Sequence, residues 1–223
     1  MLNRILRRLS IERLKFSVKP EKSLRSIVNL ELLTKRQQSN MQELSEAYHH
    51  YVSNISSANM AISLELAAFF YAVCEERNSK KILDLGSGFS SFVAGKYAQS
   101  NDAISCWSVD DNAGWLEKTK EYLSNHHITS NRCLLLEEFI RSNESKFDLM
   151  LLDLNFGEVR KDFIRLTVER GNSGAIILFD DAHKPDYRYE VLRQCRLLSV
   201  TLYDIKKYTN DSYGRYALLG VKK

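Results

Sequence analysis

Short apolar segments alternate with helical segments along most of this chain, and this alternation constrains the fold more than any other feature. The apolar segments are nearly continuous and lack the alternating polar positions of a half-exposed strand. Strands of that kind, each followed by a helix, predict a parallel sheet with helices on both faces. The expected strands cover residues 80–85, 103–109, 133–139, 146–154 and 174–181, and the expected helices cover 90–100, 113–126, 158–170 and 186–196.

The two ends of the chain extend this pattern. Helices are expected at 41–54 and 56–78, and the last 25 residues predict two strands around a turn at 210–214. We therefore predict an α/β fold with a doubly wound, mostly parallel, seven-stranded sheet, an antiparallel C-terminal hairpin and N-terminal helices. The predicted division is a helical N-terminal extension and lid at 1–57, followed by the main domain at 58–223.

Positive charge is concentrated near the N-terminus. The formal net charge is +4, but residues 1–40 carry ten Lys/Arg and three Asp/Glu, whereas the remainder carries 22 and 25. The opening "MLNRILRRLSIERLKF" places apolar residues at near-helical spacing among four arginines. Either packing against the rest of the protein or peripheral contact of residues 1–20 with an anionic membrane or a partner explains this pattern. The slightly acidic remainder argues against a nucleic-acid groove.

The remaining composition predicts a soluble protein. No apolar run reaches the roughly 18 residues that a membrane span needs. The four cysteines are scattered, mostly within or beside apolar segments, which favours reduced, buried thiols and a cytoplasmic location over disulfides or a zinc site.

Acidic residues recur where the predicted strands end. Ligands of such sheets bind beyond the carboxyl ends of the strands, so these positions are the candidate site. In "ILDLGSGFSS", two glycines follow the first strand, where backbone amides can approach a ligand and a helix N-terminus favours an anionic group. The acids at or beside four of the five strand ends are Asp84, Asp110, Asp153 and Asp180.

The first two strand ends do not match a dinucleotide-binding fingerprint. Ser91 stands where that fingerprint has Gly or Ala, and Asp84 adds negative charge beside the loop where a pyrophosphate would bind. An acid there suits a ligand with an amino group. Asp110 lies 24 residues after Gly86, at the end of the next strand, where it is placed to accept both hydroxyl groups of a ribose.

These segments resemble the motifs of the class I S-adenosylmethionine-dependent methyltransferases. "ILDLGSG" is similar to their first motif, "SVDDNAGWLEKTKEYL" to their second and "FDLMLLD" to their fourth-strand motif. The resemblance covers roughly residues 58–223 and implies a Rossmann-like methyltransferase fold and S-adenosylmethionine as cofactor. An alternative is that the aspartates only form turns. The cofactor-binding residues that the resemblance implies are Asp84, Gly86, Ser87, Gly88, Ser90, Asp110, Asp111 and Asp153.

The segment before the first strand is similar to the leader of O-methyltransferases that act on small molecules. In that group, this helix folds over the cofactor. The resemblance implies contacts from Met60 and Ser63 to the methionine end of the cofactor, although packing in the core is the alternative.

Three carboxylates gather after the fourth and fifth strands. Asp153, Asp180 and Asp181 repel one another if uncompensated, and a hard divalent cation such as Mg²⁺ would relieve that repulsion. Their pattern resembles the divalent-metal-dependent O-methyltransferases, including the catechol type, and implies that these three residues hold the metal and that Asp153 also takes part in catalysis. The alternative is a metal-free site in which one Asp orients the substrate and another caps the turn.

His183 is the predicted general base, because it lies three residues after Asp180 and O-methylation requires the loss of a proton. It could instead cap the following helix or bond a carboxylate structurally. The lysine that serves as base in the catechol type is missing, since Phe156 stands three residues after Asp153. This difference counts against a catechol substrate.

The leading hypothesis is an S-adenosylmethionine-dependent enzyme that O-methylates a small hydroxylated metabolite or sugar with the help of a divalent cation. A second hypothesis is an N-methyltransferase acting on nucleic acid, but "DLNF" lacks both prolines of the Asp-Pro-Pro-Tyr signature. A third is a non-catalytic, cofactor-binding scaffold. The sequence indicates neither the identity of the acceptor nor the oligomeric state.

Overall fold

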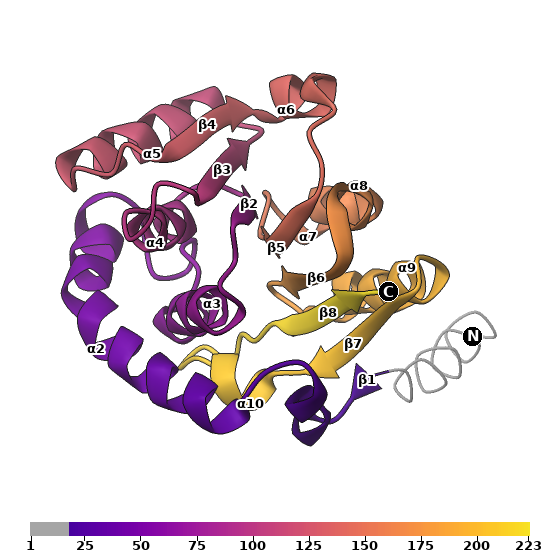
Figure 1. Ribbon diagram of the computed structural model, residues 1–223. Helices are drawn as coiled ribbons and strands as arrows, with labels where there is room; N and C mark the ends of the chain where they lie inside the picture. The colour runs from indigo at the N-terminus through magenta and orange to yellow at the C-terminus, as the bar shows by residue number, and fades with distance from the viewer. Residues whose placement is uncertain (1–17) are drawn as a thin grey trace.

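The structure is a computed structural model that describes residues 18–223, so most of the basic segment expected to contact a membrane lies outside the described residues. One sheet crosses the molecule between two layers of helices (Figure 1). Its strands are β1 (Val18–Lys19), β2 (Lys81–Leu85), β3 (Ser105–Asp110), β4 (Asn131–Leu135), β5 (Phe147–Leu152), β6 (Gly171–Phe179), β7 (Val200–Asp204) and β8 (Leu218–Lys222).

The strand order is β1-β7-β8-β6-β5-β2-β3-β4. Only β8 runs antiparallel to its neighbours, β6 and β7, so the expected hairpin inserts its last strand between β6 and β7 in an otherwise parallel sheet. The expectation of seven strands is corrected to eight, because the two-residue strand β1 pairs with β7.

Helices cover both faces of the sheet, as the alternating pattern predicts. Alternate residues of one strand serve the two faces: Leu149 and Leu151 of β5 pack in one core cluster, and Met150 and Leu152 pack in the other. Figure 1 shows the two layers on either side of the sheet. One layer contains α2 (Leu30–Asn54), α3 (Leu64–Arg77), α4 (Phe89–Ala98) and α5 (Ala113–Asn125), and the other contains α6 (Leu136–Ser142), α7 (Gly157–Arg160), α8 (Ile164–Arg170) and α9 (Pro185–Leu197).

The N-terminal helices belong to the main core. Helix α2 buries Leu33, Leu44 and Tyr51 in the same cluster as α3 and one face of the sheet. It begins at Leu30 rather than at residue 41, because the side chain of Asn29 accepts hydrogen bonds from two backbone amides of the first turn. The division at 57/58 stays a prediction, and it falls in the loop between α2 and α3.

Two expected elements differ from the structure. The strand expected at 133–139 ends at Leu135, and α6 begins at once, with the carboxylate of Glu138 accepting a hydrogen bond from the amide of Leu135. The helix expected at 158–170 is divided into α7, a 3-10 turn at Lys161–Phe163, and α8. A short helix that was not expected, α10 (Lys206–Thr209), lies between β7 and the final turn.

The chain reverses its direction across the sheet between β2 and β5. From β2 it proceeds outward to β3 and β4, then returns to β5 beside β2 and proceeds to the other edge. Such a switch point leaves a crevice at the carboxyl ends of the strands. Cys74, Cys106 and Cys195 are buried, as expected. Within residues 18–223, no helix combines the length and apolarity needed to cross a membrane.

Candidate active site

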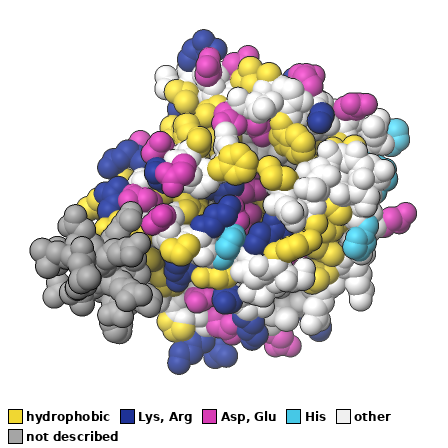
Figure 2. Space-filling model, turned by 180° about the vertical axis from the view of Figure 1, so that it is seen from behind, with side chains coloured by type: hydrophobic (Ala, Val, Ile, Leu, Met, Phe, Trp, Pro, Cys, Tyr) yellow, Lys and Arg dark blue, Asp and Glu magenta, His cyan; other side chains and the backbone are white. Residues whose placement is uncertain are grey.

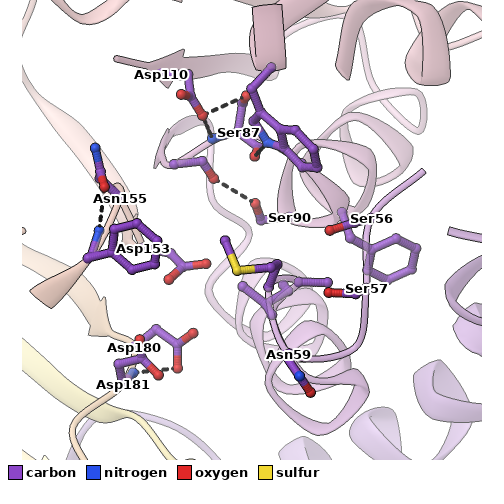
Figure 3. Close-up of a pocket in the computed structure, with 18 of the residues that line it drawn as sticks. Ser56, Ser57, Asn59, Ser87, Ser90, Asp110, Asp153, Asn155, Asp180 and Asp181 are labelled. Atoms are coloured by element: carbon purple, nitrogen blue, oxygen red, sulfur yellow. Dashed lines mark hydrogen bonds between the residues drawn. The ribbon is translucent and has the colours of Figure 1, made fainter. Parts of the chain in front are cut away.

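A cavity of about 510 Å³ lies at the switch point, beyond the carboxyl ends of β2, β3, β5 and β6. The loop between α2 and α3 faces the strand ends across it, and Figure 3 shows Ser56, Ser57 and Asn59 of this loop opposite Asp153 and Asp180. Most of the predicted site residues line the cavity, namely Gly86, Ser87, Gly88, Ser90, Asp110, Asp111, Asp153, Asp180 and Asp181.

Glycines are required in the loop after β2 because its backbone is packed against other groups. Gly86 has a φ of 109°, and a Cβ built on it would lie 2.5 Å from the carbonyl carbon of Asp153. A Cβ on Gly88 would lie 2.9 Å from the hydroxyl oxygen of Tyr51, which reaches the loop from α2. The loop is therefore held between the end of β5 and α2, and its own backbone forms a wall of the cavity.

Asp110, at the end of β3, is bonded to this loop. Its Oδ2 accepts hydrogen bonds from the amide of Ser87 at 2.8 Å and from the hydroxyl of Ser87 at 2.9 Å, as Figure 3 shows. Burial raises the pKa of Asp110, although the hydrogen bonds that it accepts oppose the shift. The indole of Trp115, in the first turn of α5, donates to the carbonyl of Ser87 at 2.7 Å. These bonds fix a carboxylate beside the glycine loop at the cavity wall.

Asp84 is not among the described residues that line the cavity, unlike the other residues predicted to bind the cofactor. It is fully buried, and its Oδ2 accepts hydrogen bonds from the hydroxyls of Ser90 at 3.0 Å and Ser91 at 2.6 Å. Its Oδ1 is buried without a partner in the described part of the chain. Burial raises the pKa of Asp84 to about 7. Asp84 thus holds the first turn of α4 against the end of β2.

Asp111 connects two sides of the cavity opening. Its carboxylate accepts a hydrogen bond of 2.6 Å from the side-chain amide of Asn155, in the loop after β5. This contact joins the end of β3 to the end of β5 across β2.

The carboxylates after β5 and β6 converge, as the sequence predicts, but they are compensated by basic side chains. Arg160 of α7 has an Nη2 atom 2.6 Å from Asp153 Oδ1 and an Nη1 atom 3.1 Å from Asp181 Oδ2. Lys184 Nζ lies 2.5 Å from the same Asp181 oxygen. Burial opposes ionisation of Asp181, but the charges of Arg160 and Lys184 outweigh it and lower its pKa.

Asp180 has no basic partner within hydrogen-bonding distance among residues 18–223. Its Oδ1 accepts a hydrogen bond of 2.6 Å from the amide of Asp181, and its side chain lines the cavity (Figure 3). Burial, followed by the neighbouring charge of Asp181, raises the pKa of Asp180. Asp180 is therefore the carboxylate of this group that is available to a ligand.

Three solved structures that are similar to this chain contain S-adenosylmethionine or S-adenosylhomocysteine. No protein-family model matches the chain, and no curated protein sequence matches it. The O-methyltransferase TomG from Streptomyces achromogenes, solved with S-adenosylmethionine (SAM), superposes with a TM-score of 0.65 at 13% identity over 85% of this chain and 98% of that one. The O-methyltransferase from Bacillus cereus, solved with S-adenosylhomocysteine (SAH), gives 0.60 at 13% identity over 83% and 91%. The SAH-bound methyltransferase PaMTH1 from Podospora anserina gives 0.61 at 13% identity over 81% and 87%.

The chain has the class I methyltransferase fold. At these identities the likeness concerns the fold alone, so the chemistry must be argued from the residues of this chain. This chain has a cavity of suitable size for a nucleoside cofactor with an amino-acid tail. A glycine loop, whose backbone can approach the ligand closely, and the carboxylate of Asp110 form its wall. These residues fit S-adenosylmethionine.

The divalent cation does not fit. Asp153 and Asp181 form ion pairs with Arg160, and within residues 18–223 no group of three His, Cys, Asp or Glu side chains has an arrangement that could hold a metal ion. The prediction that Asp153, Asp180 and Asp181 form a Mg²⁺ site stays a prediction, and the geometry does not support it. Its premise was three uncompensated carboxylates, and the structure compensates two of them.

His183 stands outside the described lining of the cavity. Its Nδ1 lies 3.5 Å from Asp181 Oδ1, too far for a hydrogen bond, and its ring contacts that of Tyr216 edge to face. The proposal that His183 is the general base remains untested, and its position does not support it.

Several residues that build this site were not predicted from the sequence. Arg160 and Lys184 lie within charged stretches that resemble ordinary solvent-exposed helix faces, although Lys184 follows Asp181 by three residues and could have been paired with it. Met60 lines the cavity rather than packing in the core, whereas Ser63 caps α3 by accepting a hydrogen bond from the amide of Leu66. The contact of Met60 with a cofactor stays a prediction.

Arg215, just before β8, was also missed. It donates to the carbonyls of Ala58, Asn59 and Ala61 at 2.9 to 3.2 Å and so holds the loop between α2 and α3 in place. No local sequence pattern indicates a contact that spans more than 150 residues.

Proposed function

We propose that this protein is an S-adenosylmethionine-dependent O-methyltransferase that acts on a small hydroxylated molecule. The observation that carries the proposal is a single cavity with two different polar walls. One wall is the glycine loop with Asp110, and the other contains the carboxylates of Asp153 and Asp180. The first suits the nucleoside of the cofactor and the second suits a hydroxyl group.

The glycine-loop wall would hold the cofactor. When bound, S-adenosylmethionine supplies an electrophilic methyl group on a sulfonium. Ser87 holds Oδ2 of Asp110 and the amide of Asn112 holds Oδ1 at 2.9 Å, which orients the carboxylate to accept the hydroxyl groups of a ribose. Ser56, Ser57 and Asn59, in the loop held by Arg215, provide polar groups on the opposite side for the amino-acid end of the cofactor.

The carboxylate wall would bind the acceptor, and Asp180 would take its proton. Methyl transfer to oxygen requires removal of the hydroxyl proton, and a carboxylate can accept it when its pKa is raised toward the working pH. Asp180 lines the cavity, and its Oδ2 has no protein partner among residues 18–223. Asp153 is oriented by Arg160 and would position the acceptor oxygen.

The charge distribution favours a small molecule over a nucleic acid. Residues 1–17 contain five Lys/Arg and one Asp/Glu, so residues 18–223 contain 27 of each and have no net charge. Basic and acidic side chains are interspersed on the face in Figure 2, without the broad positive surface that a nucleic acid requires.

The first experiment tests cofactor binding by isothermal titration calorimetry with SAH, and NAD⁺ serves as the control ligand. We expect SAH to bind with one site per chain and NAD⁺ not to bind. Asp110→Asn should weaken SAH binding about 10- to 100-fold, which corresponds to the 1.5–3 kcal/mol of a charge-assisted hydrogen bond. Absence of SAH binding to the wild-type protein would refute the proposed function.

The second experiment assigns the base. Transfer from [methyl-³H]-S-adenosylmethionine is measured with a panel of phenols, catechols and sugars, followed by Asp180→Asn and His183→Ala on the best acceptor. We expect Asp180→Asn to lower kcat about 100-fold or more, the usual contribution of a general base, while His183→Ala leaves kcat nearly unchanged. The reverse result would assign the base to His183, the residue predicted from the sequence.

A further inference from the structure

Arg160 places a buried guanidinium between the loops that follow β5 and β6. Its side chain is only 3% exposed, and it reaches Asp153 from one side and Asp181 from the other. These are two of the three positions at which the family resemblance implies a divalent ion. The chain therefore has a positive charge of its own at the place where the metal was expected.

The backbone after β5 is bonded to the same guanidinium. Nη2 donates to the carbonyls of Asn155 at 2.6 Å and Asp153 at 3.0 Å, and Nε donates to the carbonyl of Leu154 at 3.2 Å. Carbonyl and carboxylate oxygens are the ligands that a hard cation needs. Here they accept N–H groups in the fixed planar arrangement of an arginine side chain, so a metal ion would have to displace Arg160 to reach them.

The balance of charge at this wall points the same way. Asp153, Asp180 and Asp181 bring at most three negative charges, and Arg160 and Lys184 bring two positive charges within 3.1 Å of Asp153 and Asp181. One negative charge remains, on Asp180. A divalent ion at this wall would gain little attraction and would be repelled by two nearby cations.

We propose that Arg160 is the permanent cation of the acceptor site, so that the site works without a divalent ion and binds its acceptor through a single hydroxyl group. The inference rests on the proposed function, because it names the acceptor class of the same cavity. A metal ion can hold two neighbouring hydroxyl groups at once, whereas Asp180 offers one oxygen, Oδ2, because its Oδ1 already accepts the hydrogen bond from the amide of Asp181. Met60 and Phe156 line the cavity with side chains that are each 62% exposed, which favours an acceptor with an apolar or aromatic ring.

Manganese binding tests this inference independently of turnover. Free Mn²⁺ is measured by electron paramagnetic resonance while a solution of the whole 223-residue chain is titrated with it. We expect the wild-type protein to bind no Mn²⁺ in the cavity, and Arg160→Ala to gain one Mn²⁺ per chain by exposing the three aspartates. Arg165→Ala is the matched control, because Arg165 is 61% exposed and its one ion pair within residues 18–223 is with Glu169 on the same helix. Arg160→Lys retains the charge and should bind no Mn²⁺.

Wild-type protein that binds one Mn²⁺ per chain, and loses it on Asp180→Asn, would overturn the inference. If the wild-type protein binds Mn²⁺ and Asp180→Asn leaves that binding unchanged, the ion lies elsewhere on the surface, and the inference is supported. The absence of Mn²⁺ binding to the wild-type protein supports it as well. If Arg160→Ala does not fold, the wild-type protein and Asp180→Asn still decide the question.

Acceptor turnover provides a second test. On the panel of acceptors, EDTA should leave turnover unchanged and monohydroxylated phenols should be methylated; turnover that EDTA abolishes would contradict the inference. SAH binding, measured on the same samples, separates the two failures. If the wild-type protein does not bind SAH, the proposed function is refuted. If it binds SAH and also binds Mn²⁺ in the cavity, only the role of Arg160 is refuted.

Discussion

Gly86→Ala is expected to damage both stability and cofactor binding, because Gly86 combines a left-handed backbone with a backbone contact. Its φ of 109° costs a residue with a Cβ about 1–3 kcal/mol. The Cβ would also lie 2.5 to 2.7 Å from the backbone of Asp153 and Leu154, where ordinary contact begins near 3.4 Å. The end of β5 would have to move by roughly 1 Å, and overpacking of that kind costs about 1–3 kcal/mol more.

Gly174→Ala separates these two costs. Gly174 also has a positive φ, of 80°, but a Cβ built on it meets nothing within 4 Å. Urea unfolding followed by circular dichroism should give a loss of about 2–6 kcal/mol for Gly86→Ala and about 1–3 kcal/mol for Gly174→Ala. SAH affinity should fall only for Gly86→Ala. Equal losses for both variants, with unchanged SAH affinity, would refute the argument that backbone contact shapes this wall.

Three further predictions follow from other contacts of the site. Arg215→Met removes the donors to three backbone carbonyls of the loop between α2 and α3. Amide hydrogen exchange of residues 56–62 should therefore accelerate, and SAH affinity should fall about 10-fold or more. Unchanged exchange would show that Arg215 does not order this loop. Burial raises the pKa of Asp84 from 3.8 to about 7, so between these values the folded state binds more protons than the unfolded state. The free energy of unfolding, measured by urea unfolding, should therefore fall by up to about 4 kcal/mol as pH rises from 4 to 7. A fall of equal size in Asp84→Asn would contradict the assignment to Asp84. Trp115→Phe loses the bond to Ser87 and should cost about 1 kcal/mol of stability and a few-fold in SAH affinity, measured by urea unfolding and calorimetry; an unchanged value of both would show that the bond contributes nothing.

The sheet, the glycine loop and the acids at the strand ends could be predicted because each depends on a local pattern. A buried parallel strand needs a continuous apolar run, and the turn that follows it carries the residues that face the ligand. Gly86, Asp110 and Asp180 follow such runs directly. The order of the strands then determines that they share one cavity, which is why positions far apart in the sequence were assigned together correctly.

The electrostatic character of the acceptor wall could not be predicted in the same way. Arg160 belongs to a segment with helical periodicity, and the sequence gives no sign that the helix breaks at residue 161 and turns this side chain inward. Its partner Asp181 lies 21 residues away, on the loop after a different strand. Arg215 depends on the same kind of long-range contact. Charges at strand ends predict where a site lies, but only the packed structure identifies their partners.

A crystal structure of the whole chain with SAH would show where the cofactor binds. We expect the ribose hydroxyls within hydrogen-bonding distance of Asp110, the backbone of Gly86 to Gly88 against the ligand, and the sulfur directed toward Asp153 and Asp180. SAH bound outside this cavity, or with its ribose away from Asp110, would contradict the account.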